Sequence, residues 1–229
     1  MKPLRTLGVA ALVFTVGALL FWQLQPASQP LELPALAIDA TAPAGRALLR
    51  DGEGLADYPG LTTAFQVQEH GSWCGVASSV AVLNARGASL TQSGFFTPKA
   101  TAVRAKWQVN TRGMTLGDLA GMLRAHGALV QVHYAKDTTE QQFRKAIASN
   151  LSQAGDWLIV NYDRRVMNEA GGGHMSPLAA WDEDTDRVLL LDTAAYKYPP
   201  HWVPVTTLFA AMQSVDADSG RSRGWVVVR

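Results

Sequence analysis

The residue types best suited to covalent chemistry gather around Cys74, the single cysteine of this 229-residue chain. Small apolar residues follow it at intervals of three and four, which predicts a helix packed on one face and ending near Gly87. Cys74 would then lie in the first turn, where unpaired N–H groups and the helix dipole favour a thiolate, the nucleophilic form. The alternative is a buried structural cysteine, since cysteine is often buried.

A cysteine nucleophile needs a base, and the base needs an acceptor that orients it. Of the five histidines, His174 has the most suitable setting, because the three glycines before it let a substrate backbone approach closely and it opens a predicted strand. Asp192 ends the next predicted strand, and a hairpin would return it to the side of His174. Upstream of Cys74, Gln68 can offer a side-chain N–H to an oxyanion. The order Cys, His, Asp is that of papain-like proteins.

The other histidines have weaker functional settings. His126 and His133 lie at a predicted helix end and in a predicted strand, and we interpret both as structural. His201 follows two prolines and is expected to be a loop or packing residue. His70 and Cys74 have a spacing that could hold a metal, but no further ligand cluster or CxxC motif accompanies them. We therefore expect no metal site.

The elements that must position these residues follow from periodicity and turn signals. Residues 89–110 show little pattern and are expected to be irregular. Thr115 is expected to cap a helix that ends at Gly127, and Thr138 with Gln141 forms a capping box for a second helix over 138–151. Further expected elements are strands over 128–134, 157–162, 174–181, 187–192 and 225–228, and a short helix over 206–213. Helices first and strands later predict an α+β fold, with an N-terminal helical part and a C-terminal antiparallel sheet.

Composition indicates a folded domain with no nucleic-acid partner. Hydrophobic residues make up 48% of the chain, which supports a sizeable core. The formal net charge is +1, and lysine and arginine are spread along the sequence without a basic run.

The N-terminus has the pattern of a targeting segment. Lys2 and Arg5 precede an uncharged apolar run over residues 6–22, whose length lies between a signal-peptide core and a membrane span. We expect a signal peptide or membrane anchor over 1–25, a linker over 26–45 and a catalytic domain over 46–229. The basic residues should stay inside. The domain would therefore be exported, either periplasmic or anchored in the inner membrane and facing the periplasm.

At three places the sequence resembles the phytochelatin synthase family, most closely the short bacterial members that carry the catalytic domain alone. The motifs are Gln68…Trp73-Cys74-Gly75-Val76-Ala77-Ser78, Gly172-Gly173-His174-Met175-Ser176-Pro177, and Leu191-Asp192…Lys197-Tyr198-Pro199-Pro200-His201-Trp202-Val203. The resemblance implies a papain-like fold. It also implies a triad of Cys74, His174 and Asp192, with Gln68 as the oxyanion donor.

The family's donor substrate is glutathione, so the resemblance implies a thioester between γ-glutamylcysteine and Cys74, with release of glycine. Matching positions assign Asp216 to the γ-glutamyl ammonium and Arg223 to its carboxylate. Asn161, Arg164 and the Gly173 backbone are expected nearby. No cofactor is required. Cadmium or zinc would enter only as glutathione thiolate complexes.

Three functions remain open at this point. Plant-type members add a cysteine-rich C-terminal region, whereas this chain ends at Arg229 without one, so we expect hydrolysis of glutathione with minor phytochelatin synthesis. The second reading is an exported papain-like peptidase acting on ordinary peptides. The third is an exported thiol module that binds soft metals, which one cysteine supports weakly.

Overall fold

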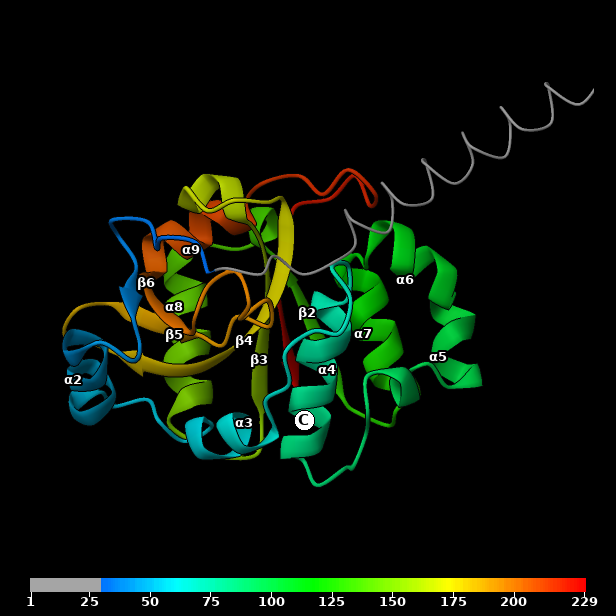
Figure 1. The fold of residues 1–229 in the computed structure, drawn as a ribbon, viewed down its shortest axis with the longest axis horizontal. Coiled ribbons are helices and arrows are strands. Elements are labelled where there is room, and N and C mark those ends of the chain that lie inside the picture. Colours follow the sequence, from blue (N-terminus) through cyan, green and yellow to red (C-terminus); the bar gives the residue numbers. More distant parts are fainter. Residues whose placement is uncertain (1–29) are drawn as a thin grey trace, which may run out of the picture.

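The computed structural model describes residues 30–229, which form one seven-stranded sheet with helices on both faces (Figure 1). Every strand pairing is antiparallel, in the order β1-β6-β5-β4-β3-β7-β2. The strands are β1 (Ile38–Asp39), β2 (Val130–Tyr134), β3 (Trp157–Asp163), β4 (Gly173–Asp182), β5 (Arg187–Leu190), β6 (His201–Pro204) and β7 (Gly224–Val228). The helices are α2 (Pro43–Asp51), α3 (Tyr58–Ala64), α4 (Cys74–Ala85), α5 (Pro98–Val103), α6 (Lys106–Arg112), α7 (Leu116–Ala125), α8 (Glu140–Leu151) and α9 (Val205–Met212).

Side-chain alternation along the central strands builds a separate core on each face. On β3, Leu158 and Val160 belong to the cluster that includes residues of α8 and α9, whereas Ile159 belongs to the cluster that includes residues of α4 and α7. Figure 1 shows α8 and α9 on one side of the central strands and α4 and α7 on the other. The expected α+β class, with a helical N-terminal part and an antiparallel sheet, is confirmed.

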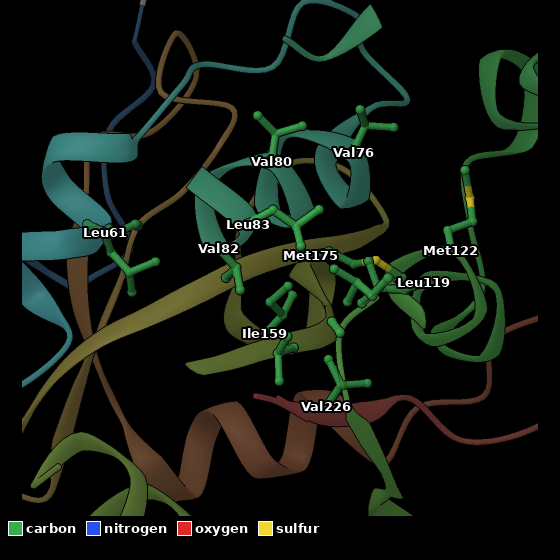
Figure 2. Close-up of a cluster of buried hydrophobic side chains, with 14 of the residues drawn as sticks. Leu61, Val76, Val80, Val82, Leu83, Leu119, Met122, Ile159, Met175 and Val226 are labelled. Atoms are coloured by element: carbon green, nitrogen blue, oxygen red, sulfur yellow. The ribbon is translucent and has the colours of Figure 1, made fainter. Parts of the chain in front are cut away.

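The helix that begins at Cys74 lies in the middle of the first core. Val76 and Val80 of α4 are fully buried, and they gather with Leu119 of α7 and Ile159 of β3 in Figure 2. Gly87 follows the helix with φ +96°, a left-handed conformation that suits the end of a helix. The helix start and stop predicted from the sequence are therefore confirmed.

Three of our expectations about local structure were wrong. Residues 89–110 are not irregular, because they contain α5 and most of α6. The capping box of α8 is formed by Thr139 and Gln142, one residue later than expected. The linker expected to reach residue 45 ends earlier, since Ile38 already pairs with Trp202 in the sheet and α2 begins at Pro43.

The predicted signal peptide or anchor lies outside the described residues. Within residues 30–229, no helix is both long and apolar enough to cross a bilayer.

Asp57, before α3, is a buried carboxyl with no hydrogen-bond partner among the described residues. Burial, together with the charge of Asp156, raises its pKa to about 8. Because the pKa is raised on folding, the carboxyl favours the folded state at acidic pH, and this advantage is lost as the pH rises toward 8. We expect Asp57→Asn, which stays neutral, to raise Tm by several degrees more at pH 9 than at pH 5. Differential scanning fluorimetry measures this, with exposed Asp51→Asn as the control. Equal shifts at both pH values would contradict the assignment.

Candidate active site

Cys74 lies at the N-terminal end of α4 and is partly exposed. The loop before it is fixed by Asn110 of α6. The indole Nε1 of Trp73 donates to Asn110 Oδ1 at 2.8 Å, and Ser72 Oγ donates to the Asn110 carbonyl at 3.0 Å. The small side chain of Ser78, on the face of α4 toward β4, donates to the Met175 carbonyl at 3.1 Å. These contacts hold Cys74 against the start of β4.

The hairpin of β4 and β5 brings Asp192 to His174. Beyond β5, the Leu191 N–H donates to the Pro177 carbonyl at 3.0 Å, so the chain continues back along β4. His174 Nε2 lies 2.8 Å from Asp192 Oδ1. The hairpin therefore brings Asp192 beside His174, as expected from the sequence. However, β5 ends at Leu190, so Asp192 lies just past the strand.

The same histidine contacts the thiol. Since Nε2 faces Asp192, the nitrogen left to face Cys74 is Nδ1. Burial opposes a thiolate, but the hydrogen bond and charge of His174 and the backbone N–H of Met175 together lower the pKa of Cys74. Burial likewise opposes an imidazolium at His174, yet Asp192 outweighs it and raises the pKa of this ring. The arrangement therefore favours a thiolate–imidazolium pair.

Asp192 is fully buried and is stabilised as a carboxylate. Burial disfavours its charge, but the charges of His174 and Arg164 hold its pKa well below the usual range. Its Oδ1 also accepts the Ala194 N–H at 2.8 Å, and its Oδ2 accepts Arg164 Nη2 at 2.5 Å.

Arg164 was expected to bind substrate, and the structure contradicts this. Its side chain is only 3% exposed, and its guanidinium bridges Asp192 and Glu169. Both arms are thus occupied inside the protein, away from the cleft in front of Cys74.

Sequence reasoning missed the role of two further residues in this interior cluster. Glu169 was not considered. His201 was expected to be a loop or packing residue, yet it starts β6, is fully buried and hydrogen-bonds Glu169 Oε1 at 3.0 Å. No spacing in the sequence links these positions, because the fold brings them together from the loop before β4 and the start of β6.

A cleft of ≈ 200 Å³ opens in front of Cys74 and His174. Four residues expected to bind substrate line it: Asn161, Gly173, Asp216 and Arg223. The strands explain this convergence, because Asn161 pairs with Gly224 on one side and Met175 on the other. Also in the lining are Gly71, Ser72, Arg112, Gly113, Met114 and Met175, of which Arg112, Gly113 and Met114 precede α7 and were not predicted.

Gly173 has a steric role beside the cleft. A Cβ at this position would lie 2.5 Å from Arg223 Nη1 and 2.8 Å from its Cζ. The guanidinium can therefore lie on the strand only because residue 173 has no side chain. In this position Arg223 Nη1 donates to Asn161 Oδ1 at 2.8 Å.

Comparison with known proteins shows the family of this chain. The model of the phytochelatin synthase family matches residues 28–225. The chain belongs to the phytochelatin synthase family. It is 31% identical over 201 residues to glutathione gamma-glutamylcysteinyltransferase 3 of Lotus japonicus, covering 84% of this chain and 42% of the relative. Glutathione gamma-glutamylcysteinyltransferase 1 of Arabidopsis thaliana is 29% identical over 201 residues, covering 84% of this chain and 41% of the relative. The chain thus spans about two fifths of the length of these curated relatives.

Gln68, expected as the oxyanion donor in this phytochelatin synthase family member, is buried beside the loop over residues 70–73 that precedes Cys74. Its backbone N–H donates to the Thr193 carbonyl at 2.8 Å, which ties it to the segment after Asp192. Its side-chain Nε2 lies 2.8 Å from the His70 carbonyl and 3.2 Å from the Tyr196 hydroxyl. The side-chain N–H groups of Gln68 are thus engaged by the backbone of His70 and Gly71, and Gln68 is not among the residues that line the cleft.

Residues 30–229 hold no group of three or more His, Cys, Asp or Glu side chains arranged to bind a metal ion. His70, considered with Cys74 as a metal pair, packs its ring on Trp73 with centroids 4.5 Å apart. His126 and His133 stack on Phe95 and Trp225, as expected for structural residues.

Proposed function

We propose that this protein is a papain-like enzyme that removes glycine from glutathione through a γ-glutamylcysteinyl thioester on Cys74. The observation that carries the proposal is the cleft that joins the Cys74–His174 pair to Asp216 and Arg223. Family membership supports the same reaction, since the curated relatives are named for γ-glutamylcysteinyl transfer from glutathione.

The geometry accounts for each proton in this reaction. The Cys74 thiolate attacks the carbonyl carbon of the Cys–Gly peptide, and the His174 imidazolium gives its proton to the leaving amine of glycine. Neutral His174 then takes a proton from water, whose oxygen attacks the thioester and releases Cys74 as a thiolate. Asp192 orients the ring through the 2.8 Å hydrogen bond and stabilises the imidazolium.

Two N–H groups are suited to the oxyanion formed in each attack. One is the backbone N–H of Cys74, which is among the first N–H groups of α4 and has no partner within the helix. The other is the side-chain amide of Gln68, which would turn one N–H from its loop partners toward the oxyanion.

The cleft offers opposite charges for the two charged groups of the γ-glutamyl end. Asp216 would accept from the ammonium, and Arg223 would donate to the carboxylate. Two buried donor atoms here, Arg223 Nε and Asn161 Nδ2, have no hydrogen-bond partner among the described residues. Donors without acceptors beside the cleft are consistent with a carboxylate ligand.

Cys74→Ala should lower the rate of glycine release from glutathione by at least about a thousandfold, because the nucleophile is lost. His174→Ala should lower this rate by as much. Asp192→Asn should lose less activity, because Asp192 forms no bond to the substrate and acts through the base. Free glycine and γ-glutamylcysteine are followed by mass spectrometry, with circular dichroism as the check on folding. Turnover of Cys74→Ala near the wild-type rate would reject the nucleophile.

A substrate control separates this proposal from a peptidase that acts on ordinary peptides. The α-linked isomer Glu-Cys-Gly has the same atoms as glutathione but presents its ammonium and carboxylate differently. Equal cleavage of both isomers would favour the peptidase.

Gly173→Ala should raise KM for glutathione by about tenfold or more, since the new methyl group displaces the Arg223 guanidinium from its place on the strand. Gly172→Ala is the matched control, because a Cβ there meets nothing within 4 Å. Steady-state kinetics of both variants test the prediction. The same KM for the two variants would show that Arg223 does not bind the donor.

We further propose that water is the main acceptor. The cleft, ≈ 200 Å³, is smaller than the roughly 300–1,000 Å³ of pockets that enclose drug-sized ligands, which favours one acyl group over two peptides. Water at about 55 M then competes well unless a bound acceptor has a large effective molarity. Cadmium or zinc would act only by presenting glutathione as a thiolate complex.

Across a glutathione series, hydrolysis to γ-glutamylcysteine and glycine should dominate, and longer (γ-Glu-Cys)n-Gly peptides should appear only at high glutathione, more so with cadmium or zinc. Quantifying both products by mass spectrometry tests this. Dominance of the longer peptides at low millimolar glutathione would mean that the protein is a competent synthase.

We also propose export of the catalytic domain, because Lys2 and Arg5 precede the apolar run over residues 6–22. Protease added to intact spheroplasts should digest the domain, whether it is periplasmic or membrane-anchored. Protection from the protease would show that the N-terminal segment does not direct export.

A further inference from the structure

A chain of buried polar contacts leads away from the catalytic pair into the protein. Asp192 Oδ2 accepts Arg164 Nη2 at 2.5 Å, and the other arm of Arg164 pairs with Glu169 Oε2. Glu169 Oε1 in turn lies 3.0 Å from His201 Nε2. The side chains of Glu169 and His201 are both 0% exposed, so neither charge is compensated by solvent.

The hydrogen bonds of His201 fix how many protons this pair holds. Ring Nδ1 lies 2.7 Å from the Pro199 carbonyl, which can only accept, so Nδ1 carries a hydrogen. Ring Nε2 faces a carboxyl oxygen of Glu169, and a hydrogen bond there requires one proton, either on the ring or on the carboxyl. In both cases the pair of Glu169 and His201 has no net charge.

We propose that Glu169 and His201 are positioning residues, a neutral pair sharing one proton that leaves the charge of Arg164 to Asp192 and so maintains the Cys74 thiolate. The net charge of the buried cluster supports this, since the charges of Arg164 and Asp192 then sum to zero and the pair of Glu169 and His201 contributes no net charge. An unbalanced Glu169 carboxylate would instead compete with Asp192 for the guanidinium. Burial opposes a charged ring at His201, but Glu169 outweighs it and raises the pKa of His201.

Several other titratable or charged groups lie around the pair of Glu169 and His201. Besides Arg164 and Asp192, buried Tyr162 is near enough to Glu169 for their charges to interact, but its hydroxyl pairs with Ser176 Oγ at 3.4 Å. The ring of Tyr198 lies 6.3 Å from that of His201. Asp39 of β1 is paired with His201 in the sheet, but its carboxylate accepts from Thr41. Lys197 is near enough to Glu169 for their charges to interact but forms no ion pair with it. Around Cys74 the facing groups are His174, Arg164, Tyr196 and the cleft residues Arg112, Asp216 and Arg223.

The test uses the reactivity of the thiol and does not require glutathione to be the substrate. Because the chain has one cysteine, alkylation by iodoacetamide, followed by intact mass, reports Cys74 alone. The pH at which the alkylation rate reaches half its plateau is the quantity compared.

His201→Gln should raise this midpoint by about half a unit or more, which slows alkylation on the acid side about threefold, since an unbalanced carboxylate disfavours a nearby thiolate. Glu169→Gln should leave the midpoint near wild type, because the amide can accept from Arg164 and donate to a neutral His201. The double variant Glu169→Gln/His201→Gln should restore the wild-type midpoint. His126→Gln is the matched control, as that ring also contacts a carbonyl, Phe95 O at 2.8 Å, away from the site.

The proposal would be overturned if the double variant reacted as slowly as His201→Gln or more slowly. Damage to packing would accumulate over the two substitutions, whereas the second substitution removes the charge imbalance left by the first. An unchanged midpoint in His201→Gln would overturn it too. If the His201 variants do not fold, NMR of the wild-type protein decides. Nitrogen shifts of His201 and the carboxyl shift of Glu169 must show one shared proton near neutral pH, and an ionised Glu169 beside a neutral ring would sink the idea. Failure of glycine release with an intact midpoint pattern would reject only the proposed substrate.

Discussion

Burial of the Asp192 carboxylate is the constraint on which the rest of the site depends. A charge removed from water is costly unless partners and hydrogen bonds replace its hydration. Here His174 and the Ala194 N–H contact one oxygen and Arg164 the other. Arg164 is itself buried, and Glu169 completes its hydrogen bonding. One orienting carboxylate thus requires a series of buried partners, and each partner fixes the loop that supplies it.

The backbone of Met175 connects this interior to the thiol. Its carbonyl accepts from Ser78 Oγ at 3.1 Å, and its N–H hydrogen-bonds Cys74. Small residues on α4 allow this approach, since a Cβ at Gly75 would meet Met114 Cε at 2.4 Å and Met175 Sδ at 2.9 Å. The helix that carries Cys74 and the strand that carries His174 are therefore joined through the main chain of Met175.

Local signals explain why much of the fold was predictable. The apolar spacing after Cys74, the cap at Thr115 and the strand pattern over 128–134 each act over a few residues, and all three elements are present in the structure. The box at Thr139 was placed one residue early because Thr138 and Thr139 both precede a glutamine at the same interval. The sequence failed to predict α5, α6 and β6, whose formation depends on tertiary contacts. Each of these elements is too short to show a clear periodic pattern.

Arg164 and Arg223 show most clearly what the sequence could not decide. Both were expected to bind substrate, yet only Arg223 lines the cleft, whereas Arg164 holds Asp192. The glycines before His174 separate these roles. A Cβ at Gly171 would lie 3.1 Å from Arg164 Cδ, and one at Gly173 would lie 2.5 Å from Arg223 Nη1. The sequence suggested that these glycines leave room for a substrate backbone. In the folded chain they leave room for two arginine side chains, one that contacts Asp192 and one that lines the cleft, and only the path of the strand determines which arginine does which.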